Sequence, residues 1–215
     1  MRRLFVAALA ALSLSAPALA PEKWEIDPAH TKAQFAVKHM MVSTVRGSFG
    51  KTSGTIEWDG KHPETLKVDA TIDATTIDTG VQKRDDHLKS KDFFDVEHFP
   101  TITFKSTKTE KDGDLVKLTG DLTIHGVTRP VTLEVEGPAT ARGPDGKVHA
   151  GAQATTKIKR SDFGLKWNMA IEAGGVAVGD EVTITIDVEA TQEARAAAKE
   201  TKKEATKKEG EPQKK

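Results

Sequence analysis

The chain has 215 residues, a length that suits one medium domain with appendages. It contains no cysteine, which excludes disulfide bonds, thiolate metal sites and lipid attachment at an N-terminal cysteine. Its 32 basic and 32 acidic residues balance, and no cluster of Lys and Arg with interleaved aromatic residues marks a nucleic-acid face. The charge pattern therefore excludes nucleic acid as a partner. Without disulfide bonds, the domain must be held together by packing alone.

Residues 1–20 have the order of a secretory signal peptide. Arg2 and Arg3 precede an apolar run, and the small residues Ala18 and Ala20 provide cleavage positions. Cleavage after Ala20 leaves Pro21 just past the cut, where proline hinders peptidase, so cleavage after Ala18 is the alternative. A membrane anchor is the competing interpretation, but the apolar run is shorter than the ~20 residues that a span needs. We expect an exported mature chain.

Eight segments of the body alternate apolar and polar residues, which is the pattern of half-buried β-strands. They span residues 33–39, 56–58, 66–72, 102–106, 116–124, 131–135, 148–158 and 182–188. Antiparallel strands with one dry face either stack as a sandwich or close as a barrel, since open edges invite aggregation. Residues 47–59 and 148–159 would each span roughly 40 Å, which favours a tall barrel with a bulge near Gly50 or Gly54.

Small residues occupy several of the predicted inward positions. They are Ala33, Ala70, Gly120, Ala150, Ala152 and Ala154. A barrel of about eight strands is just wide enough to be filled by large side chains or, with smaller ones, to hold one ligand. The small residues therefore predict a hollow bore. The alternative is that bulky inward residues such as Phe35, Trp58 and Phe104 interdigitate with them and fill the space.

Three segments break the alternation. Residues 81–90 are compatible with a short helix capped by Asp78 or Thr79, and we expect a helical crossover over one barrel mouth. Residues 160–179 carry Phe163-Gly164, Trp167 and Met169 before the pair Gly174-Gly175, and they predict a lid or a hairpin. Residues 191–215 carry Lys and Glu without an apolar stripe, which predicts a disordered or helical charged tail.

Three motifs carry a family resemblance. They are Trp24-Glu25-Ile26-Asp27-Pro28-Ala29-His30, the stretch from Arg84-Asp85-Asp86-His87-Leu88 through Phe93-Phe94-Asp95 to His98-Phe99-Pro100, and Gly120-Asp121-Leu122-Thr123-Ile124-His125-Gly126-Val127-Thr128-Arg129-Pro130. On these residues, the chain resembles the YceI-like, polyisoprenoid-binding family of bacteria over residues 24–190. The resemblance implies an all-β fold, an elongated antiparallel eight-stranded lipocalin-like β-barrel whose bore holds an isoprenoid or similar lipid. It also implies the periplasm, and no chemistry common to the family.

The predicted domains are a signal peptide over residues 1–20, a YceI-like lipid-binding β-barrel over residues 21–190 and a Lys/Glu-rich tail over residues 191–215. Within the barrel, the apolar residues expected around the ligand are Phe35, Val37, Met40, Trp58, Phe93, Phe94, Phe104, Ala152, Phe163 and Trp167. Core packing is the alternative role for each of them. Met40, Met41 and Val42 are expected to form an apolar lip at the mouth.

Three polar residues are candidates for the ligand head group. His39 is in phase with Phe35 and Val37, so we expect it to point inward, where a buried polar atom needs a partner. Arg84 and His87, held by neighbouring carboxylates, could receive a phosphate, carboxylate or quinone oxygen. The alternative for Arg84 is an ion pair with Asp85 that pins the crossover to the barrel.

Arg160, beside Asp162, presents the same choice between a ligand contact and an ion pair. No Gly-x-Ser-x-Gly elbow, phosphate-binding loop or His-Glu-x-x-His helix is present, and Asp92, Asp95 and His98 match no recognised metal-ligand spacing. We therefore expect a carrier rather than an enzyme, without cofactor or metal.

The predicted function is an exported carrier of a polyisoprenoid, such as a quinone or prenyl phosphate, or of another long-chain lipid. Two alternatives stay open, an enzyme or redox participant in which Arg84 and His87 polarise a head group, and a filled structural barrel with a stress-protective role. Exposed strand edges are compatible with a homodimer. The basic tail is compatible with transient contact with a membrane surface.

Overall fold

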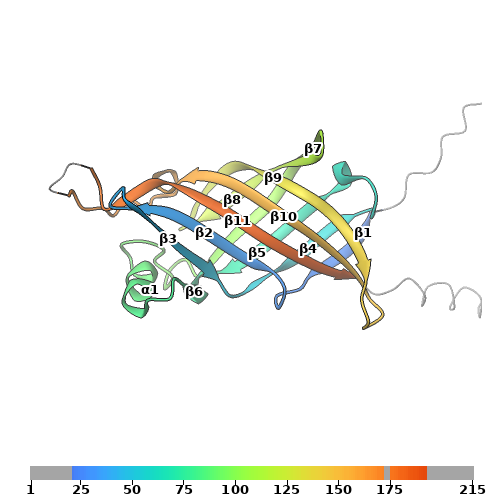
Figure 1. Ribbon diagram of the computed structural model, residues 1–215, viewed down its shortest axis with the longest axis horizontal. Coiled ribbons are helices and arrows are strands. Elements are labelled where there is room, and N and C mark those ends of the chain that lie inside the picture. Colours follow the sequence, from blue (N-terminus) through green and yellow to red (C-terminus); the bar gives the residue numbers. More distant parts are fainter. Residues whose placement is uncertain (1–20, 172–174, 193–215) are drawn as a thin grey trace, which may run out of the picture.

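The computed structural model describes residues 21–171 and 175–192, which form an all-β barrel with one α-helix (Figure 1). The elements are β1 (Glu22–Ile26), β2 (Lys32–His39), β3 (Ser43–Phe49), β4 (Thr52–Trp58), β5 (Lys67–Asp73), β6 (Ile77–Asp78), α1 (Gln82–Lys89), β7 (Thr101–Asp112), β8 (Leu115–Ile124), β9 (Val127–Arg142), β10 (Val148–Lys159) and β11 (Val178–Gln192), with 3-10 turns η1 (Pro63–Thr65), η2 (Ala74–Thr76) and η3 (Arg160–Phe163). The expected signal peptide and residues 193–215 of the tail lie outside the described residues. No helix of the described ranges is long and apolar enough to cross a membrane.

The sheet closes on itself. Strands follow one another in the order β1-β4-β5-β7-β8-β9-β10-β11, and β11 pairs again with β1, so eight strands complete the ring. All neighbouring pairs are antiparallel. β2 pairs with β11 next to the segment that pairs with β1, and β3 and β6 follow β2, so the wall extends past the ring at one end. The predicted eight-stranded antiparallel barrel is confirmed.

Alternation explains why these segments are strands. In β8, Val116, Leu118, Leu122 and Ile124 are buried, whereas Lys117 between the first two is exposed, because successive side chains of a strand point to opposite faces. All eight alternating segments of the sequence lie in strands, except that Leu66 precedes the start of β5. β1 and β6 have no counterpart among the predicted segments because they are short, with five and two residues respectively.

The long segment predicted over residues 47–59 is divided. β3 ends at Phe49 and β4 begins at Thr52, so the wall turns at Gly50, where an irregularity was expected. A second special position is Gly54, which has φ +143° and packs directly on β5. A Cβ atom at this position would overlap the carbonyl oxygen of Asp69 and would lie 2.8 Å from Cα of Ala70.

Gly54→Ala is therefore expected to destabilise the barrel. The added methyl meets backbone rather than a movable side chain, and the positive φ adds strain, so the combined loss should be about 2–4 kcal/mol of unfolding free energy. Gly60→Ala is the matched control, because Gly60 also has a positive φ of +79° but nothing within 4 Å. Urea titration of both variants checks this. If both variants lost the same unfolding free energy, backbone strain alone would explain the effect and the clash with β5 would contribute nothing.

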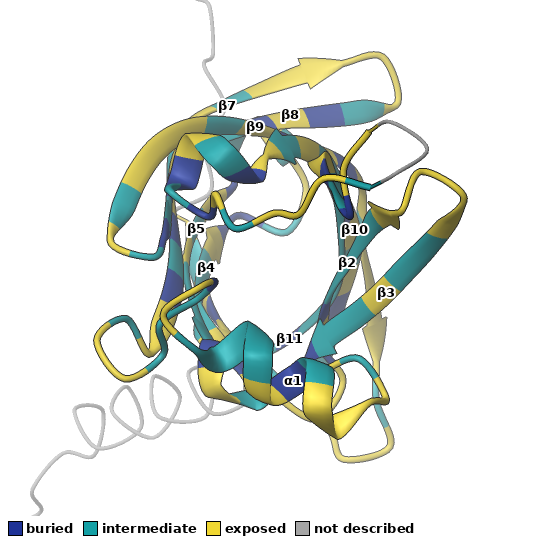
Figure 2. Cartoon of the chain, turned by 90° about the vertical axis from the view of Figure 1, so that its left-hand side faces the viewer, coloured by how far each residue is buried: buried dark blue, intermediate teal, exposed yellow. Residues whose placement is uncertain are grey.

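Helix α1 lies at one end of the ring, as Figure 2 shows in a view along the barrel. The expected crossover helix is confirmed, but its expected cap is wrong, since the N-cap residue is Val81, without a side-chain cap. Asp85, in the first turn, instead accepts hydrogen bonds from N and Oγ1 of Thr79. At the same end, Ala170 bridges Val176 and the backbone N of Ala177 donates to the carbonyl oxygen of Met169, so the described residues on the two sides of the expected hairpin pair with each other.

Candidate functional site

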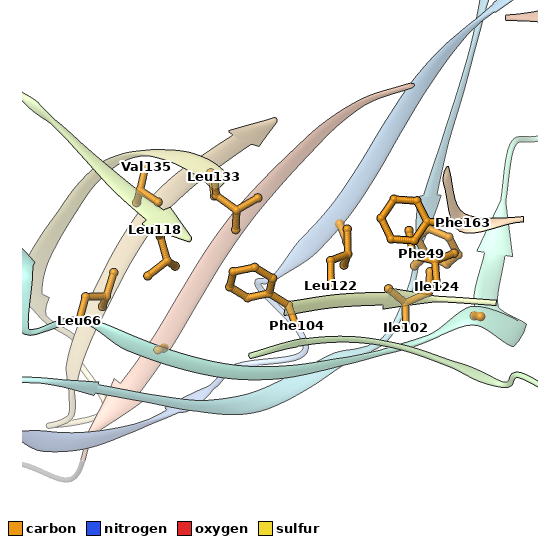
Figure 3. Close-up of a cluster of buried hydrophobic side chains, with 14 of the residues drawn as sticks. Phe49, Leu66, Ile102, Phe104, Leu118, Leu122, Ile124, Leu133, Val135 and Phe163 are labelled. Atoms are coloured by element: carbon orange, nitrogen blue, oxygen red, sulfur yellow. The ribbon is translucent and has the colours of Figure 1, made fainter. Parts of the chain in front are cut away.

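A long apolar bore runs through the barrel. Its lining extends from Trp24, Trp58 and Leu66 at the β1 end to Leu88, Phe93 and Phe163 at the α1 end. Figure 3 shows part of this lining, with Leu66 and Leu118 toward one end and Phe49 and Phe163 toward the other. The cavity has a volume of about 220 Å³. One water-sized group occupies roughly 10–15 Å³ of such a volume, so the cavity has room for roughly fifteen to twenty such groups.

Partial exposure of inward side chains shows independently that the interior is hollow. β11 sends Val182, Ile184, Ile186 and Val188 into the bore, yet each of them is only half-buried. In a filled core, such residues would be fully enclosed by neighbours at a packing density near that of crystals. The filled-barrel alternative is therefore wrong.

The small inward residues create this space only in part. Ala33, Ala70, Ala150, Ala152 and Ala154 all contribute to the lining, as the hollow-bore prediction requires. Gly120 differs, because the ring of Phe104 lies against it and a Cβ there would be 2.5 Å from Cζ of that ring. At Gly120, the alternative interpretation is therefore correct, because the bulky Phe104 ring fills the space that the small residue leaves.

The apolar residues predicted to surround a ligand divide into two groups. Eight of them line the bore, namely Phe35, Val37, Trp58, Phe93, Phe94, Phe104, Ala152 and Phe163. Met40 is outside the lining, and together with Met41 and Val42 it is exposed at the β2–β3 tip, near the α1 end (Figure 1). Trp167 is also outside, where its ring packs on Phe93 at 5.2 Å between centroids.

The three polar head-group candidates lie outside the bore lining. His39 is exposed at the end of β2, so the expectation that it is enclosed is wrong. Nε of Arg84 donates to Oγ1 of Thr79 at 2.7 Å and Nη2 to its carbonyl oxygen at 2.9 Å, so Arg84 pins the crossover by hydrogen bonds rather than through an ion pair with Asp85. His87 Nε2 lies 3.0 Å from Asp92 Oδ2, and its ring stands edge-on to Trp167.

Arg160 brings a charge to the bore. It follows Ala150, Ala152, Ala154, Thr156 and Ile158 in the inward row of β10, and it is only 8% exposed. The side chain donates from Nε to the carbonyl oxygen of Gly179 and from its Nη atoms to those of Leu165 and Val178. Counting every second residue along β10 would have found this inward position.

A histidine–carboxylate cluster lies at the opposite end of the wall. Potential ligand atoms of Asp27, His30 and Glu189 lie within 4.8 Å of one another, a grouping that sequence spacing did not reveal. His149 joins them, with Nδ1 2.7 Å from Oε1 of Glu189 and Nε2 3.0 Å from Oδ1 of Asp145. Hydrogen bonds to the carboxylates raise the pKa of both histidines and lower the pKa of Asp27 and Asp145.

This cluster should make stability depend on pH. A raised histidine pKa stabilises the fold fully below the ordinary value of 6.5, and the effect is lost as pH rises through the pKa of the folded state. The carboxylates of Asp27 and Asp145, whose pKa is lowered, stabilise the fold fully above pH 3.8. This stabilisation is lost as the pH falls through their pKa in the folded state. In urea titrations, His149→Gln should therefore cost most stability near pH 5 and little near pH 9. His39→Gln is the control, and an equal pH profile for both variants would contradict the assignment.

Comparison with known proteins agrees with this geometry. An eight-stranded antiparallel barrel with an apolar bore belongs to the class of hollow β-barrels that are wide enough for one ligand. The chain belongs to the YceI-like family, because the family model for the YceI-like domain matches residues 24–190. The family and its span agree with the resemblance carried by the sequence motifs.

Individual relatives cover most of the barrel. Protein YceI of Escherichia coli O157:H7 is 38% identical over 186 residues, which is 86% of this chain and 94% of the relative. The solved YceI protein of Campylobacter jejuni is 37% identical, with a TM-score of 0.63 over 73% of this chain and 90% of its own. A polyisoprenoid binding domain from Saccharophagus degradans, 16% identical, shares the fold with a TM-score of 0.56 over 78% of this chain and 97% of its own.

Proposed function

We propose that this protein is an exported carrier that shields one elongated apolar molecule in its bore, an isoprenoid lipid such as a quinone or prenyl phosphate, without making or breaking a bond. The observation that carries the proposal is the continuous apolar bore with half-exposed aliphatic side chains. The Saccharophagus degradans domain, which shares the fold, is described as polyisoprenoid binding, and this supports the same class of ligand. The predicted signal peptide supports export to the periplasm.

Burial of the chain supplies the binding energy. A lipid segment of about fifteen carbons would gain ~12 kcal/mol at about 0.8 kcal/mol per methylene. Lost translational and conformational freedom offsets a large part of this gain, about 4 kcal/mol or more. The remainder, at most ~8 kcal/mol, corresponds to about micromolar affinity without many polar contacts. The bore should therefore discriminate chain length better than chain type.

The α1 end is the proposed entrance. Trp24, Trp58 and Leu66 are all buried at the β1 end, where they pack the interior closed. At the α1 end, the lining includes the half-buried Leu88 and Phe94, and several exposed apolar residues gather around it. These residues are Met40, Met41, Val42, Val81, Met169 and Val176. An apolar tail could pass this rim with less exposure to water than at a polar surface.

Native mass spectrometry of the protein purified from its producing cell tests the proposal. The expected result is an added mass that organic extraction removes and that geranylgeraniol restores in a one-to-one complex. Protein that carries no lipid and takes up no geranylgeraniol would overturn the carrier function. An enzyme would instead convert the added lipid. The mass of the lipid extracted from the complex should therefore be compared with the mass of the lipid that was added, and a difference between them would indicate turnover.

A further inference from the structure

Arg160 is the one charged residue in the bore lining among residues 21–171 and 175–192. The rest of the lining is aliphatic or aromatic, with a few hydroxyl and amide groups. A guanidinium is always protonated in proteins, and a charge in an apolar site is costly unless an anion pairs with it. The position therefore raises the question of what balances this charge.

Protein groups satisfy the guanidinium only in part. Three of its five N–H groups have partners, and all three partners are neutral carbonyl oxygens, those of Gly179, Leu165 and Val178. No ion pair within the described residues includes Arg160. Asp180 is the acidic neighbour whose charge stabilises the Arg160 guanidinium. The carboxylate of Asp180 is nevertheless exposed, and it accepts hydrogen bonds from N and Oγ of Ser161.

Burial lowers the pKa of Arg160, and the charge of Asp180 counteracts this only in part. The lowered pKa means that burial destabilises the charge of this guanidinium, so an anion placed beside it would be stabilised. This agrees with the partners described above, none of which carries a charge in contact with the guanidinium.

The location suits a head group. Arg160 comes after the inward row that starts at Ala150, and ten residues of strand cover roughly 33 Å. It lies where β10 passes into η3, with Phe163, Leu165 and Val178 around it in the lining. An amphiphile with its tail along the row of alanines would therefore have its polar end at Arg160, near the α1 mouth.

We propose that Arg160 binds an oxyanion head group, so that the ligand is an acidic amphiphile, a long-chain or isoprenoid carboxylate or phosphate, held tail-inward. The proposal rests on the carrier function and narrows its ligand class. Bidentate pairing of guanidinium with carboxylate or phosphate provides both the geometry and the charge balance. Neutral lipids of the same length would bind through the tail alone.

Matched pairs of probes test this in the full-length protein. Hexadecanoic acid is compared with 1-hexadecanol, and geranylgeranyl phosphate with geranylgeraniol, by displacement of a fluorescent apolar probe. The acid and the phosphate should each bind about 10- to 100-fold more tightly than the alcohol, the factor expected for a charge-assisted hydrogen bond. Arg160→Gln should remove this difference and leave alcohol binding unchanged, whereas Arg160→Lys should keep part of it.

Arg46→Gln is the control variant, because it removes the same charge from β3, where Arg46 is exposed and lies outside the lining. It should leave all four affinities unchanged. If Arg160→Gln fails to fold, the wild-type comparison of acid with its methyl ester decides, since equal binding would overturn the proposal. Equal binding of acid and alcohol would do the same while leaving the carrier function intact. Failure of all four probes to bind would instead overturn the carrier function.

Discussion

Ala152→Phe is expected to weaken binding of geranylgeraniol by about 100-fold while the barrel stays folded. Ala152 lines the bore and is half-buried, so a phenyl ring at this position would extend into space that is open in the structure. The ring would exclude about four methylene-sized groups of ligand, which at about 0.8 kcal/mol each is ~3 kcal/mol. Because the ring enters open space, overpacking should cost less than in a filled core.

The neighbouring position provides the control for this variant. Gln153 is exposed on the outer face of the same strand, so Gln153→Phe adds the same side chain without entering the bore. Displacement of a fluorescent apolar probe by geranylgeraniol measures both affinities, and thermal unfolding measures the fold. If the two variants bound the lipid equally well, the ligand would not occupy the space beside Ala152.

Trp58→Ala should cost about 3–5 kcal/mol of unfolding free energy, the range for removing a large aromatic side chain from a core. Trp58 is 3% exposed, and its ring packs on Trp24 with 5.8 Å between centroids. Nε1 of Trp24 donates to the carbonyl oxygen of Trp58, and Nε1 of Trp58 donates to that of His62. The substitution therefore removes packing and leaves the carbonyl oxygen of His62 without this donor at the closed end of the bore.

Trp167→Ala is the matched control at the opposite end. Trp167 is only half-buried and stands against His87 and Phe93 outside the bore lining, so its loss should cost about 1–2 kcal/mol. Chemical denaturation of both variants compares the two ends directly. A smaller loss for Trp58→Ala than for Trp167→Ala would contradict the assignment of the packed end.

Alternation in the sequence predicted the strands well because it reports which side of a sheet each residue faces. It placed the inward row of β10 from Ala150 to Ile158, and the closed ring then follows from the need to cover strand edges. The break between β3 and β4 and the short strands β1 and β6 depend on contacts between distant segments. Gly54 on Asp69 is one such contact, which no local pattern contains.

Head-group candidates were harder to place, because the rule of alternation ends where a strand ends. His39 is in phase with Phe35, but β2 ends there and the chain turns outward into the Met40–Met41 tip, where both residues have positive φ. Arg84 is on a helix, where its partner is Thr79 rather than the bore. Arg160 was a candidate with two open roles, a ligand contact or an ion pair. It continues the phase of β10 into η3, so the same rule carried two residues further would have placed its side chain inward.

The central claim is that an apolar chain lies inside the barrel, and paramagnetic NMR tests it most directly. Hexadecanoic acid with a nitroxide near its terminal methyl is added to protein with labelled Ala and Ile methyl groups. The account predicts selective broadening of Ala154, Ile184 and Ile186, which line the bore, with little effect on the exposed Ala139 and Ala141 of β9. Broadening confined to the outer methyl groups, or none at saturating probe, would contradict it.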